Sequence, residues 1–229
     1  MIPSSVKLVR IQALSGVAFA VFLSLHLANT AAAIISAGSY DAFQGVARRF
    51  YQQVVVEIVL VAGALILHVA ASLELARRRK RGPAPAELRV HRYSGYFLLT
   101  VVFVHVLATR GAALFQGVPV AAQYLSFTLA TWPIIFFPYY ALLFAAGACH
   151  LLIGLRLALG RLGVHWAIGM KISSVRVALV GTLGLGLLGL AALGGRVWPV
   201  VITERSAYER YFESFLPAVV LPWRSSNSR

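Results

Sequence analysis

The amino-acid sequence predicts an all-α integral membrane protein with five transmembrane helices. Of the 229 residues, 59% are hydrophobic and only 12% are charged, and the mean hydropathy is +0.79, a composition that soluble domains rarely reach. Five apolar stretches each contain about 20 or more residues, the length that a helix needs to cross a hydrocarbon core of about 30 Å. These stretches cover residues 12–34, 52–76, 93–114, 132–158 and 175–197. We therefore expect a transmembrane domain over residues 1–197 and a tail over residues 198–229.

The positions of the cations predict which helix ends face the cytoplasm. The net charge of +14 would suit a nucleic-acid-binding protein, but the lysines and arginines gather in the connections between the apolar stretches. The second and fourth connections are rich in them, whereas the first contains only Arg48 and Arg49 and the third only Arg110. Because positively charged connections remain in the cytoplasm, we expect a bacterial cytoplasmic-membrane protein with its N-terminus inside and its tail outside.

The first and fifth stretches differ in character. Residues 12–34 predict a membrane-spanning helix and not a cleavable signal peptide, because the stretch is too long and no clear small-residue cleavage site follows it. The fifth stretch is rich in glycine (Gly181, Gly184, Gly186 and Gly189 among others), and small residues let membrane helices approach closely. We expect the fifth helix to support the other four.

Each of the first four stretches contains one histidine; these are His26, His68, His105 and His150. An ionisable side chain within a bilayer costs at least a few kcal/mol and usually has a function there. Neutral imidazole is the commonest metal ligand in proteins, including for haem iron. A histidine that only hydrogen-bonds across a helix interface is the alternative for any one of them. Four histidines in four successive helices favour metal ligation.

An internal repeat relates the first helix pair to the second. The segment RIQALSG at residues 10–16 returns as RVHRYSG at residues 89–95, and in both copies a histidine follows the glycine by ten residues. The second and fourth stretches resemble each other more weakly. The repeat predicts a four-helix core made of two equivalent helix pairs, with the fifth helix added to it.

Counting residues from the flanking arginines predicts the depth of each histidine. At 1.5 Å per residue, His26 and His105 lie about 20–24 Å from the cytoplasmic edge, while His68 and His150 lie within about 14 Å of it. We therefore expect two haem b groups, an outer one between His26 and His105 and an inner one between His68 and His150. With a single cysteine, Cys149, and no C-x-x-C-H segment, neither a covalently attached haem nor an intrachain disulfide is expected.

With these features the chain resembles the single-polypeptide, five-helix, dihaem cytochrome b subunit of succinate:quinone and quinol:fumarate oxidoreductases. The resemblance covers most of residues 8–180 and implies that the subunit anchors a flavoprotein and an iron–sulfur protein on the cytoplasmic face. It implies that electrons pass between the iron–sulfur chain and membrane quinone through a proximal haem on His68 and His150 and a distal haem on His26 and His105. The motifs that carry it are Arg10…Ser15-Gly16…His26, Glu57 eleven residues before His68, His91-Arg92-x-Ser94-Gly95…His105-x-x-x-Thr109-Arg110, and His150 followed by Gly154.

Two positions depart from the pattern that the resemblance suggests. The tail from Trp198 onward is longer than expected and has no assigned role. Some quinol:fumarate members have a glutamate two residues before the fourth histidine, proposed for proton transfer, where this chain has Ala148.

Glu57 is the only acidic residue well within an apolar stretch and is the candidate catalytic residue. It lies about 16 Å outward of His68 along the helix, where a carboxylate could exchange protons with a quinone. The alternative is an interfacial glutamate that faces lipid headgroups or pairs with Arg48 or Arg49. Whether quinone binds near the outer haem, near the inner haem or at both stays open.

Further candidates for cofactor binding are polar residues near the helix ends. Arginines and lysines there would neutralise haem propionates, or serve only as topological anchors. Ser15 and Ser94 would donate to a propionate or pack beside the porphyrin, or serve only as small interface residues. His91 and His165 are expected in or beside cytoplasmic connections, solvated or in contact with propionates. The cationic candidates are Arg10, Arg89, Arg92, Lys171 and Arg176.

Two other functions are compatible with the same residues. The first is a dihaem cytochrome b that serves a different quinone-linked enzyme, such as a hydrogenase or a formate dehydrogenase. The second is a proton-coupled transporter without haem, in which the histidines and Glu57 relay protons.

Overall fold

The computed structural model of the protein describes residues 4–79, 82–217 and 220–222, and the regular elements within these ranges are all helical. Five helical rods are long and apolar enough to cross a membrane, and they coincide with the five predicted stretches. The predicted fold class, an all-α multi-pass membrane protein, is confirmed. The rods span Val6–Ala32, Val56–Arg77, Ala86–Gln116, Pro133–Arg161 and Ile172–Leu193.

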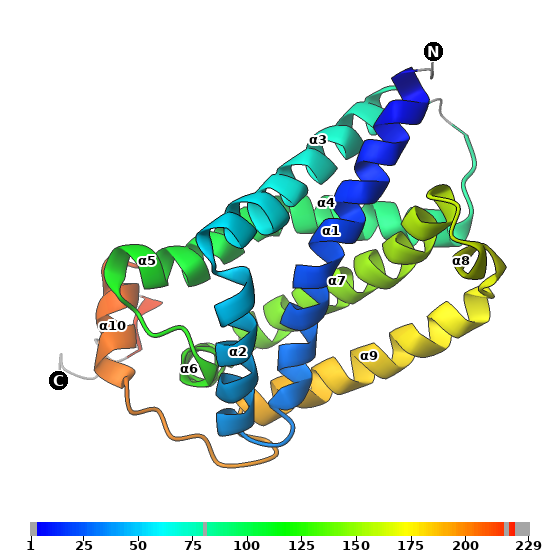
Figure 1. Ribbon diagram of the computed structural model, residues 1–229. Helices are drawn as coiled ribbons and strands as arrows, with labels where there is room; N and C mark the ends of the chain where they lie inside the picture. Colours follow the sequence, from blue (N-terminus) through cyan, green and yellow to red (C-terminus); the bar gives the residue numbers. More distant parts are fainter. Residues whose placement is uncertain (1–3, 80–81, 218–219, 223–229) are drawn as a thin grey trace.

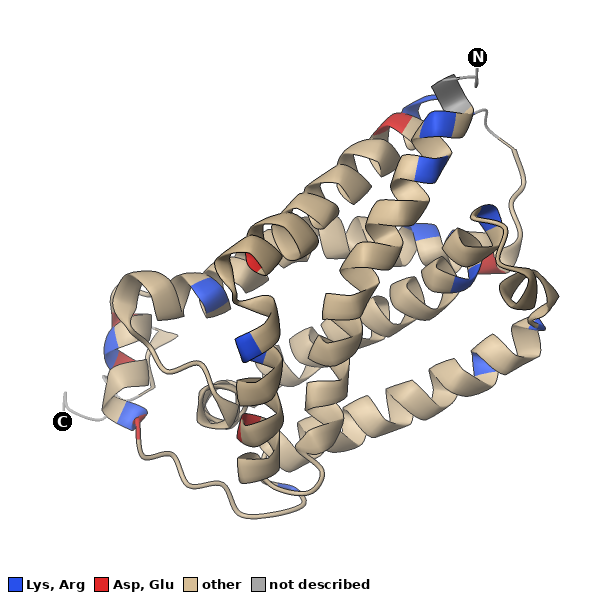
Figure 2. Ribbon diagram, viewed as in Figure 1, with Lys and Arg blue, Asp and Glu red and all other residues tan. Residues whose placement is uncertain are grey.

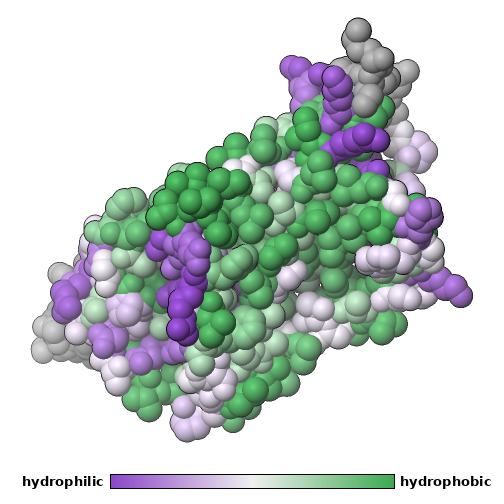
Figure 3. Space-filling model, viewed as in Figure 1, coloured by the Kyte–Doolittle hydropathy of each residue, from purple (hydrophilic) through white to green (hydrophobic). Residues whose placement is uncertain are grey.

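One end of the bundle, which we call the basic end, collects many of the cations (Figures 1 and 2). Figure 3 shows that the surface between the two ends of the molecule is mostly hydrophobic. This distribution is the one expected for rods that cross a bilayer. The basic end holds the start of α1 (Ser4–Ala32), the end of α3 (Ala64–Arg77), the start of α4 (Ala86–Val106), the end of α7 (Pro133–Arg161), α8 (His165–Gly169) and the start of α9 (Ile172–Leu193).

The opposite end, which we call the cap end, contains short helices that the sequence patterns did not predict (Figure 1). Two of the rods also contain π-helical segments, in which the backbone hydrogen bonds skip one more residue than in an α-helix. The short helices are α2 (Ala37–Tyr51), α6 (Ala122–Thr131) and α10 (Arg205–Glu213). The π-helical segments are η1 (Val56–Gly63) and η2 (Leu107–Gly111), and α5 (Ala112–Gln116) completes the third rod after η2.

Helix α1 lies at the centre of the packing. It packs against α3, α7 and α9, while α4 packs against α7. Among the described residues, neither α1 and α4 nor α3 and α7 make extensive contacts with each other. These two diagonals therefore leave room for side chains that face each other across the interior.

Helix α9 supports the core through its glycines, as predicted. A Cβ atom added at Gly186 would overlap the ring of Phe144 in α7, and one added at Gly189 would overlap the carbonyl oxygen of Thr30 in α1. Only glycine permits such close contacts between helices.

The tail forms part of a compact cap instead of a free extension. Tyr208 and Phe212 of α10 are buried against Tyr124 and Phe127 of α6 in one cluster of aromatic and aliphatic side chains. The Tyr208 hydroxyl donates to the carbonyl of Pro119 at 3.1 Å, and the Tyr124 hydroxyl donates to a carbonyl of η2 at 2.8 Å. Helix α10 therefore packs against α6, and α6 is hydrogen-bonded to the rod that carries η2. Residues 218–219 and 223–229 of the predicted tail lie outside the described residues.

We predict that Phe212→Ala destabilises the cap by about 3–5 kcal/mol, the usual cost of removing a buried aromatic ring. Phe212 is 5% exposed, whereas Phe215, two residues after the end of the same helix, is 54% exposed. Thermal unfolding and limited proteolysis in detergent measure the effect, and Phe215→Ala is the matched control. Equal effects of the two substitutions would contradict a packed cap.

Candidate functional site: two pairs of facing histidines

The structure brings the four membrane histidines together in the two pairs that the depth count predicts. The ring centroids of His26 in α1 and His105 in α4 are 5.9 Å apart, and their planes differ by 74°. Those of His68 in α3 and His150 in α7 are 6.0 Å apart, and their planes differ by 85°. Two imidazoles that bind one metal ion from opposite sides, through bonds of about 2 Å, also have centroids about 6 Å apart. Each pair therefore has the spacing of two axial ligands.

The backbone orients the pair nearer the basic end through the internal repeat. His68 Nδ1 donates to the carbonyl of Gln12 at 3.0 Å, and His150 Nδ1 donates to the carbonyl of His91 at 3.0 Å. Gln12 and His91 occupy the same position in the two copies of the repeat. Because Nδ1 carries the proton in each ring, Nε2 keeps the lone pair that a metal ion requires.

The repeated Ser-Gly step explains how the helices approach the two rings. The hydroxyls of Ser15 and Ser94 donate to backbone carbonyls three residues earlier, at 3.2 and 3.0 Å, and these carbonyls are the ones that accept from the histidines. A Cβ atom added at Gly16 would lie 2.9 Å from Nδ1 of His68. One added at Gly95 would lie 3.1 Å from Nδ1 of His150. The serines thus act on the histidines through the backbone.

The pair nearer the cap end is oriented by aromatic side chains. The His26 ring stacks on Phe22 at 5.6 Å, and Phe22 meets Tyr51 of α2 edge-on at 5.0 Å. The hydroxyl of Tyr139 lies 3.4 Å from His105 Nδ1. His26 itself is exposed.

His91 is packed against the inner histidine pair, which the sequence did not predict. It was expected in or beside a connection, but α4 begins at Ala86, so His91 lies within the helix. Its ring stacks on His150 with centroids 4.1 Å apart and planes 15° apart. A Cβ atom added at Gly154 would lie 2.6 Å from His91 Cε1, so this glycine makes room for the His91 ring. His165, in α8, is exposed as expected.

One of the predicted cationic candidates, Arg92, is half-buried at the basic end and has one nitrogen without a partner. Nε of Arg92 is buried and has no hydrogen-bond partner among the described residues. Arg161 donates to the side chain of Gln12 at 2.9 Å, and that side chain donates to Ser72 at 2.8 Å, so three helices are linked beside the inner pair. The remaining predicted cations lie on exposed positions; these are Arg10, Arg89, Lys171 and Arg176. A buried guanidinium nitrogen without a partner suits a carboxylate ligand such as a haem propionate.

Glu57 forms a two-pronged ion pair with Arg110. The distances from Arg110 Nε and Nη2 to the two carboxylate oxygens are 2.7 and 2.8 Å. Glu57 lies in η1 and Arg110 in η2, so two π-helical segments present the pair. The ion-pair partner is therefore Arg110, and not Arg48 or Arg49 as considered from the sequence. Both side chains remain about one-third accessible, at 30% and 31%.

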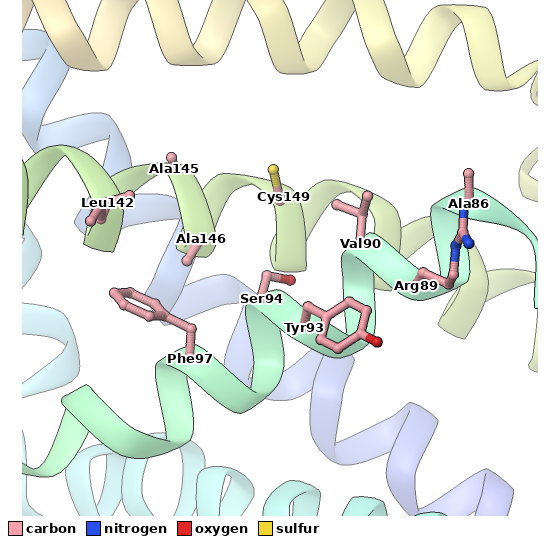
Figure 4. A pocket seen from close by; sticks show the side chains of 10 residues that line it. All are labelled: Ala86, Arg89, Val90, Tyr93, Ser94, Phe97, Leu142, Ala145, Ala146 and Cys149. Carbon is pink, nitrogen blue, oxygen red and sulfur yellow. The ribbon is translucent and has the colours of Figure 1, made fainter.

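A separate open groove of about 560 Å³ lies between α4 and α7 (Figure 4). Tyr93 and Phe97 line it from α4, and Leu142 and Cys149 line it from α7. Its lining does not include the four membrane histidines. The groove is therefore distinct from the space between the histidine pairs.

Comparisons with protein-family models, curated proteins and solved structures find no match to this chain. Function therefore has to be inferred from the chain's own residues. Within the described part of the chain, no three or more His, Cys, Asp or Glu side chains cluster as a metal site. The two histidine pairs are the candidate ligands because each has the spacing of two axial ligands, which haem iron can take.

Sequence reasoning missed several residues that complete the two sites. Gln12 was part of the repeat but was not singled out, although its carbonyl orients His68. Arg48 and Tyr51 approach the outer pair only because α2 folds back beside α1, as Figure 1 shows. From the sequence, Arg48 was only an arginine in a short connection, and such a residue indicates membrane orientation but not a binding role.

Proposed function

We propose that the protein is the membrane-anchor, dihaem cytochrome b subunit of a succinate:quinone oxidoreductase, a succinate dehydrogenase or fumarate reductase. The observation that supports it best is the pair of ring separations, 5.9 and 6.0 Å, at two levels of the bundle. In this proposal the basic end faces the bacterial cytoplasm and docks an iron–sulfur subunit, which joins a flavoprotein.

Two bound haem b groups would supply one-electron transfer between the two levels of the bundle. The protein's own residues provide the ligands, the surroundings and the protons. His68 and His150 hold the inner site, and the carbonyls of Gln12 and His91 fix their ring orientation. Arg92, half-buried at the basic end with an unpartnered Nε, would provide a positive charge for a carboxylate substituent. Glu57, accessible at the cap end, would exchange protons with membrane quinone.

The spectrum and subunit composition of the purified complex test this proposal. We expect a b-type α band in the reduced-minus-oxidised spectrum, two haems per chain, and co-purification with a covalently flavinylated protein and an iron–sulfur protein. A molybdenum or nickel enzyme as partner would assign the protein to another quinone-linked complex. Absence of haem would contradict the proposal and favour the proton-coupled transporter.

We predict that Glu57→Gln lowers quinone turnover about 100-fold, the usual contribution of a general acid or base, while haem content stays at two per chain. The amide keeps the size of the side chain but cannot accept a proton. Steady-state assays with a quinone analogue measure the effect. Glu74→Gln is the control, because Glu74 pairs with Arg77 and Arg78 at the basic end. Retention of more than half of the turnover would remove Glu57 from the mechanism.

A further inference from the structure

Arg48 of α2 is a partly buried cation with an unused donor. Its Nη2 donates to the carbonyl of Val120, but its Nε is buried and has no partner among the described residues. Within the same part of the chain Arg48 forms no ion pair, and Asp41 of the same helix instead accepts from the backbone N–H of Ala122 at 2.8 Å. Leaving a buried guanidinium N–H without an acceptor is costly, so an anionic ligand at this position would be stabilising.

Contacts on the cap side connect Arg48 to the outer histidine pair. The Arg48 guanidinium is close enough to the Tyr51 phenol to interact with it electrostatically, and Tyr51 meets Phe22, which stacks on His26. Partial burial raises the pKa of the Tyr51 phenol, although the nearby Arg48 acts in the opposite direction. Arg48 is also close enough to His26 to interact with it electrostatically.

A second unpartnered group lies on the same side of His26. Asn29, one helical turn further along α1, is only 5% exposed, and its Oδ1 has no partner among the described residues. Arg48 is close enough to the nearby Tyr40 phenol to interact with it electrostatically. Rotating the Asn29 amide by half a turn would place its N–H donors where the unpartnered Oδ1 now lies. Arg48 and Asn29 could then both donate to one ligand.

We infer that Arg48, assisted by Asn29, binds a carboxylate of the haem held by His26 and His105. The inference rests on the proposed function and extends it, because the sequence candidates for propionate contacts are all assigned to the basic end or its connections. A charge-assisted hydrogen bond from a guanidinium is the strongest available partner for a carboxylate away from water. Its positive charge would also favour the reduced form of the outer haem.

Redox titration of the two haems in the purified full-length protein tests the inference. The outer haem is identified as the component that is missing from the His105→Leu variant. For Arg48→Gln we expect one of two results. Either the outer haem alone is lost, or the equilibrium constant for reduction of the outer haem falls about tenfold, which lowers its reduction potential by about 59 mV for one electron. Arg48→Lys, which keeps the charge, should restore most of the outer-haem potential.

The neighbouring Arg49 provides the matched control. It lies on the same helix, carries the same charge and is exposed, so Arg49→Gln should leave both haems unchanged. Equal effects of Arg48→Gln and Arg49→Gln, equal shifts of both haems, or loss of both haems would overturn the inference. A wild-type protein without any haem would instead contradict the proposed function itself.

Discussion

Replacement of His150 by leucine is expected to lower the haem content from two per chain to one. The substituted side chain keeps a similar volume but offers no lone pair, so the inner iron loses one of its two axial ligands. The ring of His68 would then face an apolar side chain at the position where the structure places the partner imidazole, 6.0 Å away between centroids. Haem extraction with a quantitative absorbance assay, normalised to protein, measures the result. His165→Leu, at an exposed position in α8, is the control.

Double substitutions test the pairing itself. Within a pair, His68→Leu combined with His150→Leu should still leave one haem, because both changes affect the same site. Across pairs, His68→Leu combined with His105→Leu should leave none. Such non-additive behaviour is expected when two residues act as one unit. Any other pattern would mean that the histidines pair differently, or that they do not bind haem.

Substitution of Gly95 by alanine is expected to remove the inner haem although no ligand is changed. The added Cβ would lie 2.8 Å from His150 Cε1 and 3.1 Å from its Nδ1, closer than side chains normally approach. The ring would have to move away from the carbonyl that orients it, and overpacking of this kind costs about 1–3 kcal/mol. The repeat makes the same prediction for Gly16→Ala and His68, where the distances to Nδ1 and Cε1 are 2.9 and 3.0 Å.

A glycine in α9 gives the control for this steric prediction. A Cβ added at Gly184 meets no atom within 4 Å, so Gly184→Ala should leave haem content and stability nearly unchanged. Haem stoichiometry and thermal unfolding of the three variants in detergent make the comparison. Full haem content in both Gly95→Ala and Gly16→Ala would show that the close approach of helix and imidazole is not required.

The four histidines illustrate what could be read without coordinates. Helical rise is constant, so counting from the arginines at the membrane edge was enough to place each histidine at one of two levels. The repeat of RIQALSG and RVHRYSG then made the helix pairs equivalent. Both features are local or periodic, and the structure reproduces the pairs at nearly equal separations.

The partner of Glu57 shows where such counting stops. Arg110 is 53 residues away, and the pair forms because the Glu57 side chain of η1 and the Arg110 side chain of η2 meet at the cap end. The tail is a similar case. Its aromatic residues showed no span-length pattern, yet Tyr208 and Phe212 become buried when α10 meets α6. A contact between distant segments depends on the path of the connections, and no periodicity encodes that path.

The sequence by itself determined the membrane class, the five rods and the levels of the histidines, because hydrophobicity and helical rise act along the chain within about 20 residues. Only the tertiary structure decided which carbonyl orients each imidazole, which cation meets Glu57 and why Arg48 lies beside the outer pair. The first two features join groups more than 50 residues apart, and the third requires α2 to fold back beside α1. All three follow from how the rods and the cap pack in three dimensions.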